Sequence, residues 1–159
     1  MEIRSCFFIG HREADESILP QLLGAVHRHI CEFGVNEFVV GQYGGFDRMA
    51  ASAVIAAKKK YPYIRLYLLL PYHPAERKIG LPDGSDGLIY PDGMEKVPRK
   101  VAIIRANRYA VDHCDYLIAY AWHPASNAGN LVEYAQRREE RGLIKVTLLD
   151  TPKERTKDE

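Results

Sequence analysis

Glycines and polar side chains suited to binding a phosphorylated ligand gather in four short stretches of the sequence. The stretches are GHRE at 10–13, GQYGGFDR at 41–48, PYHPAER at 71–77 and AWHPASNAGN at 121–130. Glycine leaves backbone N–H groups accessible, and arginine offers a planar pair of donors that matches a phosphate. Binding of one ligand would require the fold to bring several of these stretches together.

The second stretch carries three glycines, Gly41, Gly44 and Gly45, followed by an Asp–Arg pair. A strand, a glycine turn and a helix in this order place backbone N–H groups and a positive helix end near one point, which favours a phosphate. Asp47, followed by Arg48, would either cap the helix or accept hydrogen bonds from a ribose. A tight strand-to-helix connection with a capping Asp is the alternative interpretation. The spacing matches neither the dinucleotide fingerprint nor a P-loop.

The first stretch begins with Gly10, which ends an apolar run and lets the chain turn sharply. His11 and Arg12 follow it directly. The guanidinium of Arg12 can bind a phosphate or a carboxylate through two parallel hydrogen bonds. An ordinary surface arginine in a loop is the alternative.

The fourth stretch leads into a helix, with Ser126 and Asn127 in the loop and Gly129 and Asn130 at the expected helix start. Ser or Asn with a Glu downstream is commonly a capping arrangement. In the functional interpretation, free N–H groups at this helix start hold a phosphate. Glu133, about one turn into the helix, then projects into the same crevice and binds a sugar hydroxyl or acts as a general acid or base.

Histidines and aromatic residues flank the same stretches. His11, His73 and His123 each follow an expected strand, but they lie in separate loops without short ligand spacing, so we predict no metal site. Four aromatic side chains would either stack on a base or pack beneath the loops. They are Tyr43, Phe46, Tyr72 and Trp122.

Five short apolar runs alternate with helical patterns along the chain. The runs, which we predict to be strands, cover 3–9, 37–40, 63–70, 115–120 and 143–149. Helical spacing or alanine-rich composition predicts helices over 16–33, 47–60, 99–112 and 129–141. Nearly continuous apolar strands alternating with helices predict an α/β, Rossmann-like open parallel sheet of about five strands with helices on both faces.

Ligands of such folds bind beyond the carboxyl ends of the strands, where the strand order reverses. All four polar stretches follow expected strands and therefore fall at that edge. Residues 32–37, 61–62 and 113–115, at the opposite edge, are comparatively plain. This asymmetry predicts a ligand site at the carboxyl edge of the sheet.

The chain reads as a single domain over residues 1–150. Within it, residues 71–98 carry repeated Pro-Asp-Gly turn signals and are predicted to form a long loop or flap. The wholly polar segment 151–159 is predicted to be a disordered tail.

Composition and charge exclude several classes of function. Of the 159 residues, 47% are hydrophobic and 27% are charged, which is typical of a globular protein. A net charge of +1 argues against binding of duplex nucleic acid or an acidic membrane. No apolar stretch approaches a membrane span, and the first apolar run is too short for a signal peptide.

The cysteines point to a reducing compartment. Cys6, Cys31 and Cys114 are odd in number and widely spaced in apolar segments. We expect reduced, buried thiols of a cytoplasmic protein, and no local context marks one of them as a nucleophile.

Taken in order, five stretches resemble the YpsA-like branch of the SLOG superfamily, which also includes the DNA-uptake protein DprA and the LOG phosphoribohydrolases. The likeness covers roughly residues 3–149. It implies a Rossmann-like fold that binds a nucleotide or a nucleotide derivative at the carboxyl edge. The stretches are FFIGHRE, FVVGQYGGFDRMAASAV, YIRLYLLLPY, NRYAVDHCDYLIAY and AGNLVEYA.

The resemblance also implies site residues. The positions that match the family's motifs are Gly10, His11, Arg12, Gly41, Gly45, Asp47, Asn107, Gly129, Asn130 and Glu133. Asn130 stands where a threonine is usual, and Ala128 stands where YpsA-like members tend to have glycine. Ala106 replaces an arginine expected just before Asn107, and that arginine is associated with catalysis in the LOG enzymes. Its absence favours binding over hydrolysis, unless Arg105 or Arg108 substitutes for it.

Three functions follow as hypotheses. The first is binding or sensing of a nucleotide-type small molecule, such as a nucleoside monophosphate or an ADP-ribose-type ligand. The second is N-glycosidic hydrolysis of nucleoside monophosphates, with Glu133 as the catalytic group. The third is a single-stranded nucleic-acid or protein-interaction module. No cofactor is identified beyond such a bound nucleotide, and apolar helix faces are compatible with a homo-oligomer.

Overall fold

The computed structural model describes residues 2–75 and 81–150 of the chain. The predicted loop or flap over 71–98 therefore lies partly outside the described residues, and the predicted tail over 151–159 lies wholly outside them. In the described ranges, no helix combines the length and apolar character needed to cross a membrane.

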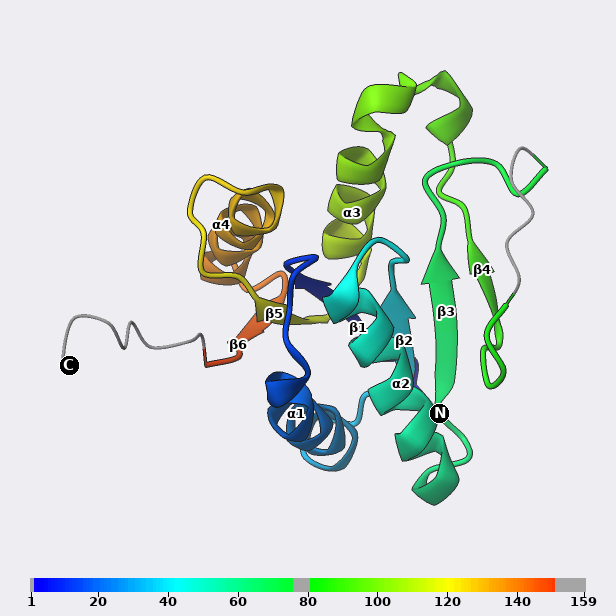
Figure 1. Ribbon diagram of the computed structural model, residues 1–159, viewed down its shortest axis with the longest axis vertical. Coiled ribbons are helices and arrows are strands. Elements are labelled where there is room, and N and C mark those ends of the chain that lie inside the picture. Colours follow the sequence, from blue (N-terminus) through cyan, green and yellow to red (C-terminus); the bar gives the residue numbers. More distant parts are fainter. Residues whose placement is uncertain (1, 76–80, 151–159) are drawn as a thin grey trace, which may run out of the picture.

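The described residues contain one sheet of six strands, and every neighbouring pair in it is parallel. The order across the sheet is β4-β3-β2-β1-β5-β6 (Figure 1). The strands are β1 (Ser5–Gly10), β2 (Glu37–Val40), β3 (Arg65–Leu69), β4 (Gly87–Ile89), β5 (Tyr116–Tyr120) and β6 (Lys145–Leu148). The prediction of an α/β, Rossmann-like open parallel sheet is confirmed.

The sixth strand, β4, lies inside the segment predicted to be a loop. A Cβ on Gly87 would lie 3.2 Å from the Tyr67 ring of β3, so glycine allows the two strands to approach closely. The carboxylate of Asp86 accepts a hydrogen bond from the backbone N–H of Leu66 at 2.8 Å and pairs with Lys58. A strand of three residues is too short to produce a periodic pattern, so side-chain anchoring rather than apolar alternation defines it.

Helices cover both faces of the sheet, with α1 and α2 on one side and α3 and α4 on the other (Figure 1). They are α1 (Leu19–Cys31), α2 (Gly45–Lys60), α3 (Ala102–His113) and α4 (Asn127–Glu140). Short 3₁₀ turns precede α1 at Glu16–Ile18 and α3 at Arg99–Val101, and another lies at Met94–Lys96. The predicted helices are confirmed, with ends that differ by a few residues.

Alternation along β1 divides the core into two layers. Cys6 and Phe8 pack beneath α1 and α2, whereas Phe7 and Ile9 pack beneath α3 and α4. Each fully buried phenylalanine contributes about 2–3 kcal/mol to folding. With apolar contacts on both faces, β1 is held at the centre of the sheet.

The strand order reverses between β1 and β5. The chain runs from β1 outward through β2 and β3 to β4, and β5 and β6 lie on the other side of β1. The loops that follow β1 and β5 therefore leave the sheet in opposite directions and open a crevice between them.

Candidate functional site

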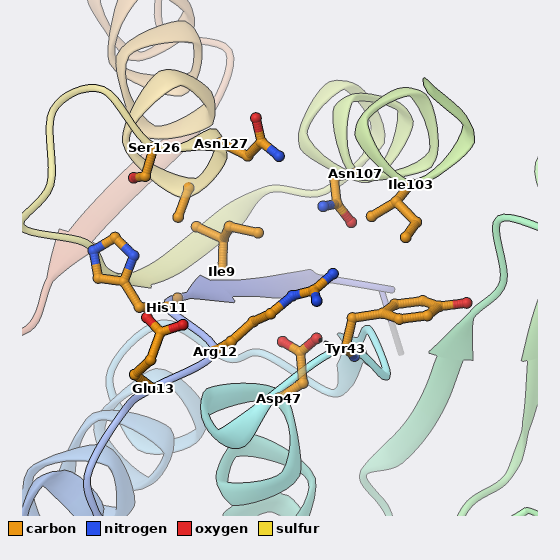
Figure 2. Close-up of a pocket in the computed structure, with 12 residues that line it drawn as sticks. Ile9, His11, Arg12, Glu13, Tyr43, Asp47, Ile103, Asn107, Ser126 and Asn127 are labelled. Carbon is orange, nitrogen blue, oxygen red and sulfur yellow. Dashed lines mark hydrogen bonds between the residues drawn. The ribbon is translucent and has the colours of Figure 1, made fainter. Parts of the chain in front are cut away.

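A cavity of about 230 Å³ lies at the carboxyl edge of the sheet, beside the ends of β1 and β5. Four segments distant in sequence line it: the end of β1 with the residues that follow it, the β2–α2 loop with the first turn of α2, α3, and the start of α4 (Figure 2). Its lining residues are Ile9, Gly10, His11, Arg12, Glu13, Tyr43, Asp47, Ile103, Asn107, Ser126, Asn127 and Ala128. Seven of them belong to the predicted ligand-binding residues: Gly10, His11, Arg12, Asp47, Asn107, Ser126 and Asn127.

The glycines that begin α2 allow close packing of two loops. The backbone N–H of Gly45 donates to the carbonyl oxygen of Arg12 at 2.8 Å. Gly44 has a φ of +132°, and a Cβ there would lie 2.6 Å from the Cα of Arg12. The prediction that the N–H groups of this turn are free to bind a phosphate is therefore wrong for Gly45, because its N–H already donates to Arg12. The turn instead fixes the backbone of Arg12.

The carboxylate of Asp47 lies in a narrow space at the cavity wall. Its Oδ2 accepts a hydrogen bond from the backbone N–H of Tyr43 at 2.9 Å. A Cβ on Gly41 would lie 2.8 Å from the same oxygen, so glycine at this position makes room for the carboxylate. Burial raises the pKa of Asp47 to about 6, against the opposing effects of the Tyr43 N–H and the charges of Arg12 and Arg48.

Arg12 reaches into the cavity from the β1–α1 loop (Figure 2). Within the part of the chain that the structure describes, its guanidinium makes no hydrogen bond or ion pair, although its charge acts on Asp47. A guanidinium on a fixed backbone, directed into a cavity and without a partner, is suited to a phosphate or a carboxylate.

His11 joins the loops that follow β1 and β5. Its side chain is 5% exposed, and Nε2 accepts hydrogen bonds from the backbone N–H groups of Trp122 at 2.8 Å and His123 at 3.3 Å. Because Nε2 is an acceptor, His11 is neutral with its proton on Nδ1. Burial, and then the neighbouring His123, lower the pKa of His11, which is consistent with this state. Although His11 lines the cavity, its Nε2 is committed to holding the β5–α4 loop in place.

Ser126 caps α4, as the capping interpretation predicted. Its Oγ accepts from the N–H of Gly129 at 3.0 Å and donates to the carbonyl oxygen of His123 at 2.7 Å. A Cβ on Gly129 would lie 2.3 Å from that carbonyl oxygen, so glycine is required for the close turn. The first turn of α4, with Asn127 and Ala128, faces the cavity at the positive end of the helix.

Asn107 contributes a side-chain amide from α3 to the cavity wall opposite Asp47 (Figure 2). Asn127 contributes a second amide from α4. An amide offers both a donor and an acceptor, which suits the hydroxyls of a sugar. The cavity thus combines a cation, a carboxylate and two amides from different elements.

Seven predicted site residues do not line the cavity. Four of them are the glycines of the turns beside it, Gly41, Gly44, Gly45 and Gly129. Arg48 borders two other hollows, one beside Ala14 and Glu16 and one beside Gly41 and Leu68.

Asn130 and Glu133 are exposed on α4 and lie outside the cavity lining. The expectation that Glu133 projects into the crevice is therefore wrong. An α-helix turns by about 100° per residue, so Glu133, five residues after Ala128 and six after Asn127, lies on a different face of α4 from these two lining residues.

Sequence reasoning missed five lining residues as ligand contacts. Glu13 is the last residue of the GHRE stretch, so its position next to Arg12 could have identified it. Tyr43 was considered only as an aromatic residue that stacks on a base or packs beneath the loops. The apolar members Ile9, Ile103 and Ala128 form part of the lining and carry no chemical signal in the sequence.

The histidines do not form a cluster of metal ligands. His11 and His123 have ring centroids 5.1 Å apart, but His73 packs against Tyr90. Across the described ranges, no group of three or more His, Cys, Asp or Glu side chains is arranged to hold a metal ion.

The expectation of three buried thiols is wrong for one of them. Cys6 and Cys114 are buried, but Cys31 is exposed at the end of α1. Burial raises the pKa of Cys6 well above its ordinary value and that of Cys114 to about 12, so both remain thiols. Cys31 faces outward because it lies on the far side of α1 from Leu22 and Val26.

Comparisons with known proteins add no assignment: no protein-family model matches the sequence, and no curated protein matches it.

Proposed function

We propose that the cavity at the carboxyl edge binds a nucleotide or a nucleotide derivative, as the resemblance to YpsA-like SLOG proteins implies. The location supports the proposal, because open α/β sheets bind ligands where the strand order reverses. The polar groups also support it, since they come from four separate segments and converge on one cavity.

Each part of such a ligand has a matching group. The phosphate would bind the Arg12 guanidinium and the positive end of α4, both of which border the cavity. The ribose hydroxyls would bond to Asp47 and Asn107. The base would lie against the Tyr43 ring at the mouth.

The cavity volume favours a ligand that is only partly enclosed. At about 230 Å³, the cavity lies below the usual range of pockets that bury drug-sized ligands, roughly 300–1,000 Å³. That size suits a sugar phosphate with its base near the opening. A dinucleotide would extend well beyond the cavity.

The unpaired Arg12 guanidinium is the observation that carries the proposal. Arg12 is exposed to solvent and bonds to no other group among the described residues, so its guanidinium is available to form charge-assisted hydrogen bonds with an anion. The raised pKa of Asp47 also supports the proposal. The fold keeps a carboxyl group where its charge is disfavoured, and such groups occur most often at functional sites.

Thermal unfolding and calorimetry with AMP, ADP-ribose and NAD test the proposal. A ligand at a hundredfold excess over its Kd should stabilise the fold by about 2.7 kcal/mol. Arg12→Ala should abolish that shift, and Arg48→Ala is the matched control because Arg48 lies outside the cavity. Absence of stabilisation by all three compounds would contradict the proposal.

A second candidate function is hydrolysis of the N-glycosidic bond of a nucleoside monophosphate. One observation favours it: a carboxyl with a pKa of about 6 in a cleft is suited to acid–base chemistry near neutral pH. Asp47 would serve here in place of Glu133, which is outside the cavity. Release of free base by the wild type but not by Asp47→Asn would support this function, and no release from any nucleoside monophosphate would exclude it.

We also propose that the protein works in a reducing, cytoplasmic compartment. Its three cysteines, all within the described residues, are free.

A further inference from the structure

Cys31 belongs to a cluster of three reactive side chains on the face of α1 that meets the end of α2. We call Cys31, His27 and Tyr61 the thiol cluster. The Tyr61 hydroxyl lies 3.1 Å from the Cys31 sulfur and 2.9 Å from Nδ1 of His27. The sulfur lies 3.6 Å from Nε2 of the same imidazole. His27 and Cys31 share one helix face because they are four residues apart.

These contacts form a route for a proton. When the Tyr61 hydroxyl donates to Nδ1 of His27, its oxygen accepts from the Cys31 thiol. Moving both protons along this chain leaves a thiolate on Cys31 and an imidazolium on His27, with Tyr61 unchanged. The imidazolium then lies beside the thiolate and stabilises it.

Tyr61 is suited to remain the donor in this chain. The hydrogen bond with Cys31, together with burial, raises the pKa of Tyr61 to about 12, so the phenol stays protonated. The ammonium of Lys60 lies 5.6 Å from the centre of the Tyr61 ring and adds positive charge to the neighbourhood.

The position of Cys31 makes these partners necessary. Cys31 is the last residue of α1, where the negative end of the helix dipole disfavours a thiolate. A cysteine at this position without partners would react slowly as a nucleophile, because little of it would be thiolate. Its reactivity should therefore depend directly on Tyr61 and His27.

We propose that Cys31 is a thiol modification site, which reacts with low-molecular-weight disulfides to form a mixed disulfide. The Cys31 thiolate attacks one sulfur of the disulfide, a new S–S bond forms, and the original S–S bond breaks. The departing thiolate takes the proton held by His27. Cys31 is oxidised and the leaving half of the reagent is reduced, so no further oxidant is needed.

This site is separate from the cavity at the carboxyl edge. Cys31 ends α1 and Tyr61 follows α2, so both lie toward the amino edge of the sheet, away from the residues that line the cavity. The proposal does not depend on the proposed function, and either can fail alone.

The test measures modification of each cysteine by oxidised glutathione at pH 7.5, peptide by peptide, with mass spectrometry. In the folded wild type, Cys31 should be modified while the buried Cys6 and Cys114 are not. His27→Gln and Tyr61→Phe should each slow the reaction of Cys31 about tenfold, the scale of one hydrogen bond to a charged group. His113→Gln and Tyr109→Phe, on α3 at the other face of the sheet, are matched controls and should leave the rate unchanged.

Modification of Cys6 and Cys114 would reveal a variant that fails to fold. A second measurement, on the wild type alone, tests the proposal without any variant. Cys31 in the folded wild type should react about fivefold faster than Cys31 of the same chain in urea, because only the fold assembles the thiol cluster. Rates in His27→Gln and Tyr61→Phe within twofold of the wild type would overturn the proposal. So would a folded Cys31 that reacts no faster than in urea.

Discussion

The two edges of the sheet use polar side chains in different ways. At the amino edge, the side chains of Asn36 and Asp115 bond to the backbone and join neighbouring segments of the sheet. The Asn36 side chain accepts from the N–H of Arg4 at 3.0 Å and donates to the carbonyl oxygen of Glu2 at 2.9 Å. The Asp115 carboxylate accepts from the N–H of Ser5 at 2.9 Å, which ties the start of β5 to β1.

At the carboxyl edge, structural and available groups lie side by side. His11 and Ser126 hold loops through backbone hydrogen bonds, as the amino-edge residues do. The Arg12 guanidinium, by contrast, has no such partner among the residues that the structure describes. Polar character alone therefore does not distinguish a binding residue from a structural one. A binding residue is instead marked by a polar group that the fold holds at a cavity without a bond to another protein group.

Substitution of Gly44 should give the largest effect, because Gly44 packs against the backbone of Arg12 and is not itself part of the cavity lining. Gly44→Ala places a Cβ 2.6 Å from the Cα of Arg12, at a φ of +132° that L-residues rarely adopt. We expect a loss of about 3–5 kcal/mol in the free energy of unfolding. Urea denaturation measures it, with Gly24→Ala, where a Cβ would meet nothing within 4 Å, as the control. Equal stability of the two variants would contradict the packing argument.

Substitution of Arg12 tests whether a side chain at the carboxyl edge without a protein partner serves binding and not stability. Arg12→Ala should weaken binding of a nucleoside monophosphate by about 30- to 100-fold, the scale of charge-assisted hydrogen bonds to a phosphate. The melting temperature without ligand should stay within about 2 °C of the wild type, because the guanidinium has no structural partner. Calorimetry and thermal unfolding measure the two quantities. A large loss of stability would show that Arg12 is structural after all.

Substitution of Asn36 is the matching experiment at the amino edge. Asn36→Ala leaves the N–H of Arg4 and the carbonyl of Glu2 without their side-chain partner, so we expect a loss of about 2 kcal/mol in stability. Ligand affinity should not change. Asn107→Ala should give the reverse pattern, with affinity reduced and stability retained. If both asparagine variants behaved alike, the distinction between the two edges would fail.

The sequence predicted the class of fold because strong apolar periodicity reports burial directly. The strands from Glu37–Val40 and Tyr116–Tyr120, for example, match their predicted runs within one residue. It did not predict β4, whose three residues are held by Asp86 and by the close approach of Gly87 to Tyr67. Contacts between side chains distant in sequence leave no periodic signal.

The sequence predicted where the candidate site lies, but it predicted the roles of only some of the residues there. The glycine turn before α2 was correctly placed, yet its purpose is to pack against the backbone of Arg12, a contact that spans two loops. Glu133 was taken into the site because helix phase relative to the cavity cannot be read from spacing alone. Cys31 was expected in the core because it lies in an apolar segment, but on α1 it lies on the side away from Leu22 and Val26.

Substitution of Asp47 should raise the stability of the protein, and the size of the effect should depend on pH. Asp47→Asn keeps an oxygen that accepts from the N–H of Tyr43 and removes a carboxylate whose charge the fold disfavours. The variant should therefore be more stable than the wild type at pH 8, by about 2 kcal/mol, since each unit of pKa shift corresponds to about 1.4 kcal/mol and part of the charge stays solvated. Ligand affinity should fall at the same time.

The sign of the pH dependence follows from the direction of the shift. The pKa of Asp47 is about 6 in the folded protein and 3.8 as the ordinary value, so folding favours the protonated form. Above pH 6 the cost of the buried charge is fully present. As the pH falls from about 6 to about 4, the folded protein binds a proton that the unfolded chain does not, and wild-type stability rises relative to that of Asp47→Asn. The two proteins should converge near pH 4 in urea denaturation. A difference that is constant with pH would mean that the carboxylate is solvated and that the carboxyl edge carries no stability cost for its function.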